Sequence, residues 1–220
     1  MEELKYQKEI FFFDMDGLLF DTETLYYQTR QRILNKYGYS YTKKDHTIYI
    51  GKGFDDTICR IQKLVKDEVF GRMIFNESMK LFQKEIESQN FSLKKGARRF
   101  LTVLNENGKS CYLTSSSSKK IIVQVLQKAQ IKEFFSGIIS GEEVARNKPA
   151  PDIYLRALSI AQTSKEKSLV FEDAKSGVAA ATQADVDVIM IPDWLPSDRQ
   201  DDDKAMVVLS DLNEAAKIFQ

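Results

Sequence analysis

The chain contains little of several residue types that mark common functional classes. It has two cysteines and one histidine among 220 residues, so neither a disulfide framework nor a cysteine–histidine zinc site is expected. Cys59 and Cys111 lie in unrelated apolar contexts, which predicts reduced thiols in the core of a cytoplasmic protein. His46 lies in the polar segment TKKDHT, which favours a surface position over a catalytic role.

The sequence also lacks an excess of charge of either sign and any long apolar run. Lys and Arg together number 32, as do Asp and Glu, so no overall field attracts nucleic acid or an anionic membrane. No apolar run could span a bilayer, and the N-terminal MEELKYQKE is too charged for a secretory signal. We expect a cytoplasmic monomer without nucleic-acid or membrane partners, in which any attraction for an anion is local.

Two aspartates follow the most informative apolar run. Residues 10–13 read IFFF, typical of a strand buried on both faces, and Asp14 and Asp16 come next, separated by one residue. Side chains two apart on a strand point the same way, so the two carboxylates should share a face, and Gly17 allows a sharp turn after them. Taken alone, the segment could also be a polar turn after a core strand.

A second apolar strand, residues 111–113, runs into hydroxyl side chains. Thr114 and the serines at 115–118 precede the helical pattern at 121–129. Hydroxyls and free backbone N–H groups at a helix N-terminus suit an anion. A serine-rich loop in which Ser118 caps the helix is the alternative interpretation.

The third segment, NKPAPDIYLRAL, places a lysine before two prolines. The prolines stiffen the loop, so Lys148 can present a fixed positive charge, although most lysines are simply solvated. Asp152 is predicted to be the N-cap of a helix whose apolar positions include Ile153, Leu155 and Leu158.

The fourth segment, SLVFEDAKSGVAAA, ends a strand at two adjacent acids. Glu172 and Asp173 offer the oxygen ligands that magnesium takes, and Gly177 lies in a helix of small residues suited to close packing on a sheet. The same acids could instead be a charge pair at a helix N-terminus.

The four segments, DMDG, LTSSSS, NKPAPD and VFEDAKSG, together resemble the haloacid dehalogenase superfamily in its phosphatase and β-phosphoglucomutase branch, over nearly the whole chain. The resemblance implies an α/β fold, a doubly wound parallel sheet with a small α-helical cap inserted after the first motif. It implies a core of residues 1–20 and 91–220 and a cap of residues 21–90. The hydrophobic pattern agrees, with helical periodicity throughout the predicted cap and strands expected near residues 111–113, 137–139, 168–171, 186–191 and 206–209.

The resemblance also implies roles for the acids. Asp14 would attack phosphorus and carry an aspartyl-phosphate, while Asp16 would donate and accept the proton. Mg²⁺ would be held by Asp14, Glu172, Asp173 and the backbone carbonyl of Asp16, offsetting the repulsion between nucleophile and phosphate. The expected activity is magnesium-dependent hydrolysis of a small phosphorylated metabolite, most simply a sugar phosphate.

The phosphate group would be held by Lys148 and by a hydroxyl of the second motif. Counting from Gly108 selects Ser115, whereas counting the strand differently selects Thr114. We take Ser115 as the binding hydroxyl, with Ser116 supplying a backbone amide.

Other members of the superfamily provide the rival functions. Dehalogenases have no use for Asp16, and the phosphonate-cleaving branch lacks this acid and needs a cap lysine, for which Lys52 is available. A binding protein on an inactivated scaffold would not need every catalytic position to be filled, as it is here.

A β-phosphoglucomutase-like mutase is the closest alternative to a phosphatase. In that mutase a histidine follows the first motif, and Tyr26 stands at the matching position. The mutase also has a cap arginine shortly after a glycine; here Gly51 and Lys52 are followed by Phe54, which cannot offer bidentate donors to phosphate. The cap side, with Tyr26, Gly51 and Lys52 as expected substrate contacts, therefore favours water as the acceptor.

Overall fold

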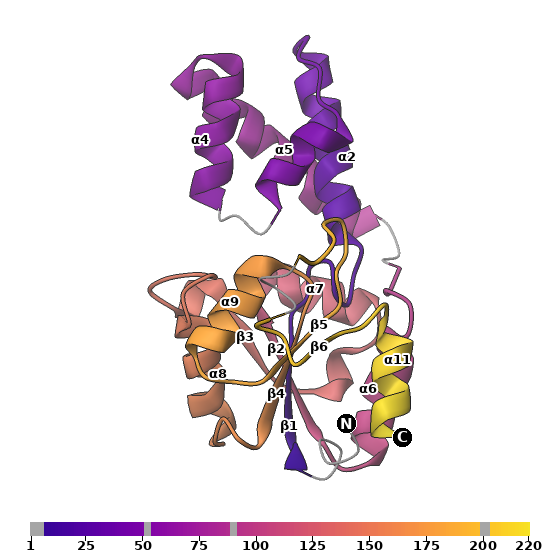
Figure 1. Cartoon of the computed structure of the whole chain (residues 1–220). Helices are drawn as coiled ribbons and strands as arrows, with labels where there is room; N and C mark the ends of the chain where they lie inside the picture. Colours follow the sequence, from indigo (N-terminus) through magenta and orange to yellow (C-terminus); the bar gives the residue numbers. More distant parts are fainter. Residues whose placement is uncertain (1–6, 51–53, 89–91, 199–202) are drawn as a thin grey trace. The chain divides into compact units, whose positions relative to one another are not determined.

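The chain folds as two compact units. A computed structural model describes residues 7–50, 54–88, 92–198 and 203–220. Residues 1–21 and 91–220 form one unit, the core unit, and residues 22–90 form the other, the helical unit. Figure 1 shows the sheet in the core unit and the helices that make up the helical unit.

The core unit is built on a parallel sheet. Each pair of neighbouring strands in the described residues is parallel, and the order is β3-β2-β1-β4-β5-β6. From β1 the chain adds β2 and β3 on one side, and then returns to add β4, β5 and β6 on the other side. The direction of winding therefore reverses between β1 and β4. The predicted doubly wound α/β fold is confirmed. The strands are β1 (Ile10–Phe13), β2 (Ser110–Ser115), β3 (Phe135–Ser140), β4 (Ser168–Glu172), β5 (Val188–Met190) and β6 (Val207–Val208).

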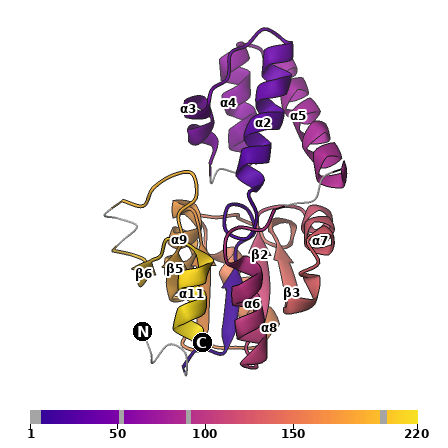
Figure 2. The same ribbon diagram turned by 90° about the vertical axis from the view of Figure 1, so that its right-hand side faces the viewer.

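Helices cover both faces of this sheet. Helices α8 and α9 pack on one face, and α6 and α11 pack against each other on the opposite face (Figures 1 and 2). The core helices and short helical turns are α6 (Ala97–Glu106), α7 (Lys119–Lys128), η2 (Lys132–Phe134), η3 (Gly141–Glu143), α8 (Asp152–Ala161), α9 (Lys175–Gln183) and α11 (Leu212–Phe219).

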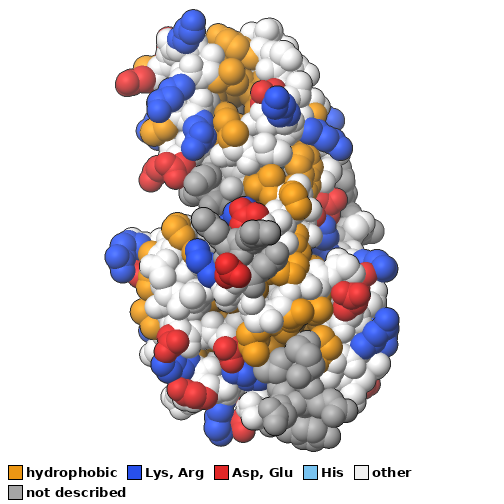
Figure 3. All heavy atoms as spheres, viewed as in Figure 1, with side chains coloured by type: hydrophobic (Ala, Val, Ile, Leu, Met, Phe, Trp, Pro, Cys, Tyr) orange, Lys and Arg blue, Asp and Glu red, His pale blue; other side chains and the backbone are white. Residues whose placement is uncertain are grey.

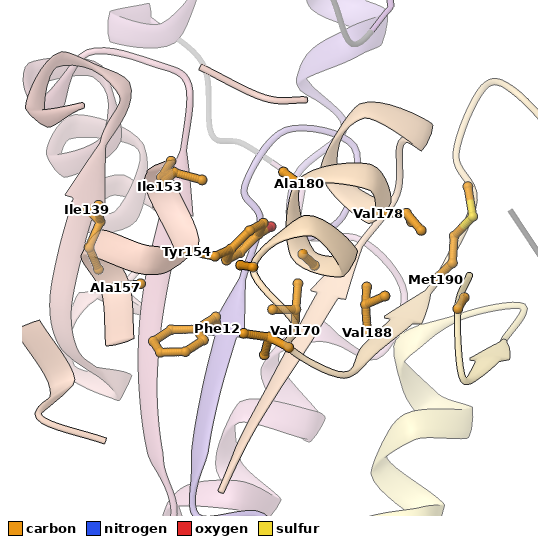
Figure 4. Packing of buried hydrophobic residues seen from close by; sticks show 14 residues of the cluster. Phe12, Ile139, Ile153, Tyr154, Ala157, Val170, Val178, Ala180, Val188 and Met190 are labelled. Carbon is orange, nitrogen blue, oxygen red and sulfur yellow. The ribbon is translucent and has the colours of Figure 1, made fainter. Parts of the chain in front are cut away.

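Strand β1 is buried on both faces, as its unbroken apolar sequence predicts. Phe12 belongs to the cluster on the α8 and α9 side (Figure 4). Phe11 and Phe13 point to the other face, where their rings meet Phe219 and Phe100 at centroid distances of 5.1 and 5.7 Å. Because all three phenylalanines are fully buried, the strand is anchored firmly at the end from which Asp14 emerges.

The helical unit has its own hydrophobic core. Its described residues form helices and no strand, and residues such as Leu34, Ile61 and Ile74 are completely buried in one cluster. Gly71 lets two of these helices approach closely, because a Cβ there would lie 2.6 Å from the Cα of Gln62. The elements are α2 (Thr22–Lys36), α3 (Lys43–His46), η1 (Thr47–Tyr49), α4 (Phe54–Val65) and α5 (Glu68–Ser88).

His46 is buried inside the helical unit, so its predicted surface position is wrong. Its Nε2 lies 2.7 Å from Oε1 of Glu23, and its Nδ1 lies 2.9 Å from the hydroxyl of Tyr41 and 3.2 Å from Arg30. The four residues before it, Thr42 to Asp45, are all exposed. A polar segment therefore forms one short helix whose last residue alone faces the core.

Replacing His46 with Ala is expected to destabilise the protein by about 2–4 kcal/mol, because Arg30 and Glu23 would lose a buried partner. Urea unfolding of the variant measures this change in the free energy of unfolding. Lys44→Ala, on the exposed side of the same short helix, is the control and should change stability little. Equal stability of the two variants would contradict a structural role for the buried network.

The two cysteines have different environments. Cys111 is buried in β2, and burial raises the pKa of its thiol to about 12, so this thiol is inert. Cys59 is exposed, which corrects its predicted core position. It lies on the face of α4 away from the buried positions Ile58, Ile61 and Val65.

Charges of both signs are interspersed on the face of the molecule seen in Figure 3. This pattern matches the equal numbers of acidic and basic residues in the sequence. Within the described ranges, no helix has both the length and the apolar character required to cross a membrane.

Candidate functional site

Three carboxylates converge where β1 and β4 end. Asp14 follows β1. Glu172 is the last residue of the neighbouring β4 and Asp173 follows it, with Phe13 directly paired to Phe171 in the sheet. One oxygen from each of the three carboxylates lies within 4.8 Å of the others. Parallel strands bring their carboxyl ends to the same edge, so the two motifs meet there.

The charge balance of this cluster depends on Lys148. Its Nζ lies 2.5 Å from Oδ1 of Asp14 and 2.6 Å from Oε1 of Glu172, and it donates to the carbonyl oxygen of Thr114. Burial acts to lower the pKa of Lys148, but the facing carboxylates of Asp14 and Glu172 outweigh it and hold that pKa well above its ordinary value. The lysine is therefore a fixed positive charge, as the rigid NKPAP loop predicts.

Burial and neighbouring charges raise the pKa values of two of the three carboxyl groups. Burial raises the pKa of Asp14 well above its ordinary value; Lys148 lowers it, while Glu172 and Asp16 raise it. Burial likewise raises the pKa of Asp173, helped by the charges of Asp14 and Glu172. Three buried acids facing a single lysine carry more negative charge than the lysine neutralises.

These donors fit a magnesium ion. Mg²⁺ prefers carboxylate oxygens, and the Asp14, Glu172 and Asp173 cluster offers one from each residue within a small volume. The pKa values of Asp14 and Asp173 are raised, which means that their charged forms are disfavoured. A bound cation would stabilise these charged forms. The predicted role of the Asp16 carbonyl as a further ligand stays a prediction.

Asp16 is held by two serine hydroxyls of the second motif. Ser115 Oγ donates to Oδ2 of Asp16 at 3.2 Å, and Ser117 Oγ donates to the same oxygen at 3.1 Å. The backbone N–H of Ser117 in turn donates to Ser115 Oγ at 3.0 Å. The first two motifs therefore form one connected hydrogen-bond network, of which Ser117 was not predicted to be a member.

The alternative hydroxyl, Thr114, has a different partner. It is fully buried, and its Oγ1 donates to the carbonyl oxygen of Phe13 in the adjacent strand at 3.2 Å. Ser116 is exposed. Ser115 is fully buried as well, and its hydroxyl donates to Asp16. The choice of Ser115 over Thr114, and the binding roles of Ser115 and Ser116, therefore stay predictions.

Glycines make room for the carboxylates. Gly17 has φ of +87°, and a Cβ at this position would lie 2.1 Å from Oδ2 of Asp173. A Cβ at Gly177 would lie between 1.9 and 2.1 Å from the carboxylate atoms of Glu172. Any larger residue at either position would displace an acid of the cluster.

Three residues near this cluster were not found by sequence reasoning. The hydroxyl of Tyr154 donates to Oε1 of Glu172. Asp193 lies beside Asp173 and helps to raise its pKa, and Lys94 donates to Oδ1 of Asp193. Asp193 could have been found, because it follows the strand predicted at 186–191 and thus belongs to the same edge of the sheet.

The helix of the third motif differs from its predicted pattern. Helix α8 begins at Asp152, and Pro151 occupies the N-cap position, so Asp152 is not the N-cap. Its carboxylate instead pairs with Arg146 at 2.8 Å. Tyr154 is fully buried, while Leu155, one of the apolar residues on which the helix was predicted, is 49 % exposed.

The predicted substrate contacts from residues 21–90 lie within the helical unit or outside the described residues. The ring of Tyr26 stacks flat on Phe82, with 3.9 Å between centroids. Phe54 is exposed and meets Phe75 edge-on. Gly51 and Lys52 lie outside the described residues, and the substrate-binding roles of Tyr26, Gly51 and Lys52 stay predictions.

Comparison with known proteins identifies the family. The family model described as haloacid dehalogenase-like hydrolase matches residues 11–191. The chain belongs to this family. A relative from Thermotoga maritima, named phosphorylated carbohydrates phosphatase, is 31 % identical over 185 residues, covering 82 % of this chain and 83 % of the relative. The predicted membership is therefore confirmed, and the chain is a hydrolase of the haloacid dehalogenase-like type.

Solved structures share the fold of this haloacid dehalogenase-like hydrolase. CbbY from Rhodobacter sphaeroides, solved with phosphate, gives a TM-score of 0.80 at 20 % identity, covering 94 % of this chain and 96 % of that one. A β-phosphoglucomutase from Clostridium difficile gives a TM-score of 0.78 at 22 % identity, covering 94 % and 92 %. At these identities the likeness establishes the fold alone.

Proposed function

We propose that this chain is a magnesium-dependent phosphatase that hydrolyses a small phosphorylated metabolite, a sugar phosphate, through an aspartyl-phosphate on Asp14. The observation that carries the proposal is the convergence of Asp14, Lys148, Glu172 and Asp173 at one edge of the sheet. The phosphatase name of the Thermotoga maritima relative supports the choice of a phosphorylated carbohydrate. A cytoplasmic monomer, acting without nucleic acid or membrane, is part of the same proposal.

In the first step an oxygen of Asp14 attacks phosphorus, and the bond from phosphorus to the ester oxygen breaks. Asp16 gives its proton to the departing alkoxide. Lys148 and Ser115 hold the other phosphoryl oxygens as charge shifts onto them. A bound Mg²⁺, held by Asp14, Asp16, Glu172 and Asp173, supplies positive charge that offsets the repulsion between carboxylate and phosphate.

In the second step water attacks phosphorus, and Asp16 takes the proton from that water. The bond between phosphorus and the Asp14 oxygen breaks, which releases inorganic phosphate and restores the carboxylate. The hydrogen bond from Ser117 to Asp16 supports this role, because it holds the side chain in one orientation while Ser115 contacts the phosphoryl group.

We further propose that residues 1–20 and 91–220 are the catalytic core and residues 21–90 the cap that selects the leaving group. Phosphate release from a panel of phosphorylated metabolites tests the substrate class. Turnover restricted to sugar phosphates would support the proposal, and turnover of phosphorylated proteins or nucleotides alone would reject it.

A mutase is the nearest alternative, and the helical unit favours the hydrolase. Tyr26, at the position of the mutase's histidine, is stacked on Phe82. Phe54 offers no donor to a second phosphate. Given β-glucose 1-phosphate and glucose 1,6-bisphosphate, the enzyme should release inorganic phosphate or leave both unchanged. A coupled dehydrogenase assay measures glucose 6-phosphate. If glucose 6-phosphate forms faster than free phosphate, the chain is a mutase.

A further inference from the structure

Glu172 is the most confined carboxylate of the cluster. It is 1 % exposed. Its Oε1 accepts a hydrogen bond from the hydroxyl of Tyr154 and forms an ion pair with Nζ of Lys148 at 2.6 Å. On another side it abuts Gly177, where a Cβ would overlap the carboxylate. One oxygen of this carboxylate also lies within 4.8 Å of an oxygen of Asp14 and of an oxygen of Asp173.

Tyr154 reaches Glu172 from a different element. It lies on α8, with its ring packed among the buried residues between the sheet and its helices, including Phe12 and Val170 (Figure 4). Its ring centroid lies 5.4 Å from Nζ of Lys148. Tyr154 therefore contacts the lysine through its ring and the carboxylate through its hydroxyl, and only the second contact needs the oxygen atom.

We propose that Tyr154 is a positioning residue for magnesium: its hydroxyl holds Glu172 in the orientation that presents a carboxylate oxygen to the ion. This inference rests on the proposed function. Burial of the ring guides the hydroxyl to a single acceptor, and the carboxylate occupies the space that a Cβ at residue 177 would fill. Helix α8 thereby sets the geometry of a ligand carried by β4.

Losing the hydroxyl should weaken magnesium binding more than it slows the chemical steps. Glu172 would keep its ion pair with Lys148 but would lose the hydroxyl donor that fixes the rotation of its carboxylate. Partners that orient metal ligands typically account for about 10- to 100-fold in metal affinity. At saturating Mg²⁺ the ion itself would hold Glu172 in place, so kcat should return close to the value of the unmodified enzyme.

Tyr154→Phe tests this directly, because it removes one oxygen and keeps the ring against Lys148. The matched control is Tyr112→Phe, in the same hydrophobic cluster, where the half-buried ring packs against Phe12. Calorimetric titration of each protein with MgCl₂ alone measures affinity without reference to activity. Activity assays then give the Mg²⁺ concentration for half-maximal rate and the kcat at saturation.

For Tyr154→Phe we expect a dissociation constant for Mg²⁺ raised by about tenfold or more, with kcat recovered at saturating Mg²⁺. Tyr112→Phe should behave as the unmodified protein. An unchanged dissociation constant in folded Tyr154→Phe would overturn the inference while leaving the proposed function intact. Absence of Mg²⁺ binding to the unmodified protein would overturn both.

A second variant approaches Glu172 from its other side. Gly177→Ala places a methyl group where the carboxylate lies, so it too should raise the dissociation constant for Mg²⁺. If Tyr154→Phe fails to fold, as judged by circular dichroism, this variant decides the question. Unweakened Mg²⁺ binding by folded Gly177→Ala would show that the confinement of Glu172 is irrelevant to the ion.

Discussion

Replacing Asp14 with Asn should reduce phosphatase turnover by about 10³-fold or more while the protein stays folded. An amide has nearly the shape of a carboxylate but cannot act as the attacking oxygen. Removing one of several buried negative charges also relieves repulsion, so the variant should unfold no more easily than the unmodified chain. Steady-state assays with p-nitrophenyl phosphate and thermal unfolding measure the two effects.

The control for this substitution is Asp187→Asn, which makes the same chemical change elsewhere in the core unit. Asp187 directly precedes β5, so it lies at the amino ends of the strands, whereas Asp14 lies at their carboxyl ends. Its carboxylate pairs with Lys8. Its turnover should match that of the unmodified enzyme. If folded Asp14→Asn retained more than a few per cent of the activity, Asp14 could not be the nucleophile.

Removal of divalent metal should abolish turnover reversibly. Without a cation, the buried carboxylates of Asp14, Glu172 and Asp173 face a phosphate ester with only Lys148 to offset their charge. Dialysis against EDTA should bring p-nitrophenyl phosphate hydrolysis to background, and added MgCl₂ should restore it. Adding NaCl at matched ionic strength is the control and should restore nothing.

The same acids predict how pH affects the metal requirement. Burial and the neighbouring acids raise the pKa of Asp173, so protons compete with Mg²⁺ as the pH falls toward that raised value. More Mg²⁺ should then be needed for half-maximal rate at lower pH. Full activity after exhaustive EDTA treatment would remove the metal from the mechanism.

The strand-end motifs could be predicted because their chemistry is local in sequence. An unbroken apolar run such as residues 10–13 predicts a strand buried on both faces. Acids at the carboxyl ends of neighbouring parallel strands lie on the same side of the sheet and therefore come together. Asp14, Glu172 and Asp173 come together for this reason. The fixed position of Lys148 could be predicted as well, because two prolines stiffen the loop that carries this lysine.

Side-chain contacts between different helices and strands could not be predicted from the sequence. Tyr154 and Leu155 are adjacent apolar residues, and only the packing of α8 on the sheet decides that the tyrosine is buried and the leucine exposed. His46 looked like a surface residue because its neighbours are polar, yet a short helix turns this one side chain inward. Periodicity is weakest in helices of a single turn, where too few positions define a face.

The most direct test of the account is to trap the phosphorylated enzyme. Acid quenching within a single turnover, followed by borohydride reduction and peptide mass spectrometry, locates an acyl phosphate on its residue. The account predicts the modification at Asp14 and none in Asp14→Asn. A phosphoryl group on another residue, such as Ser115, or turnover with no phosphorylated enzyme at any quench time, would contradict it.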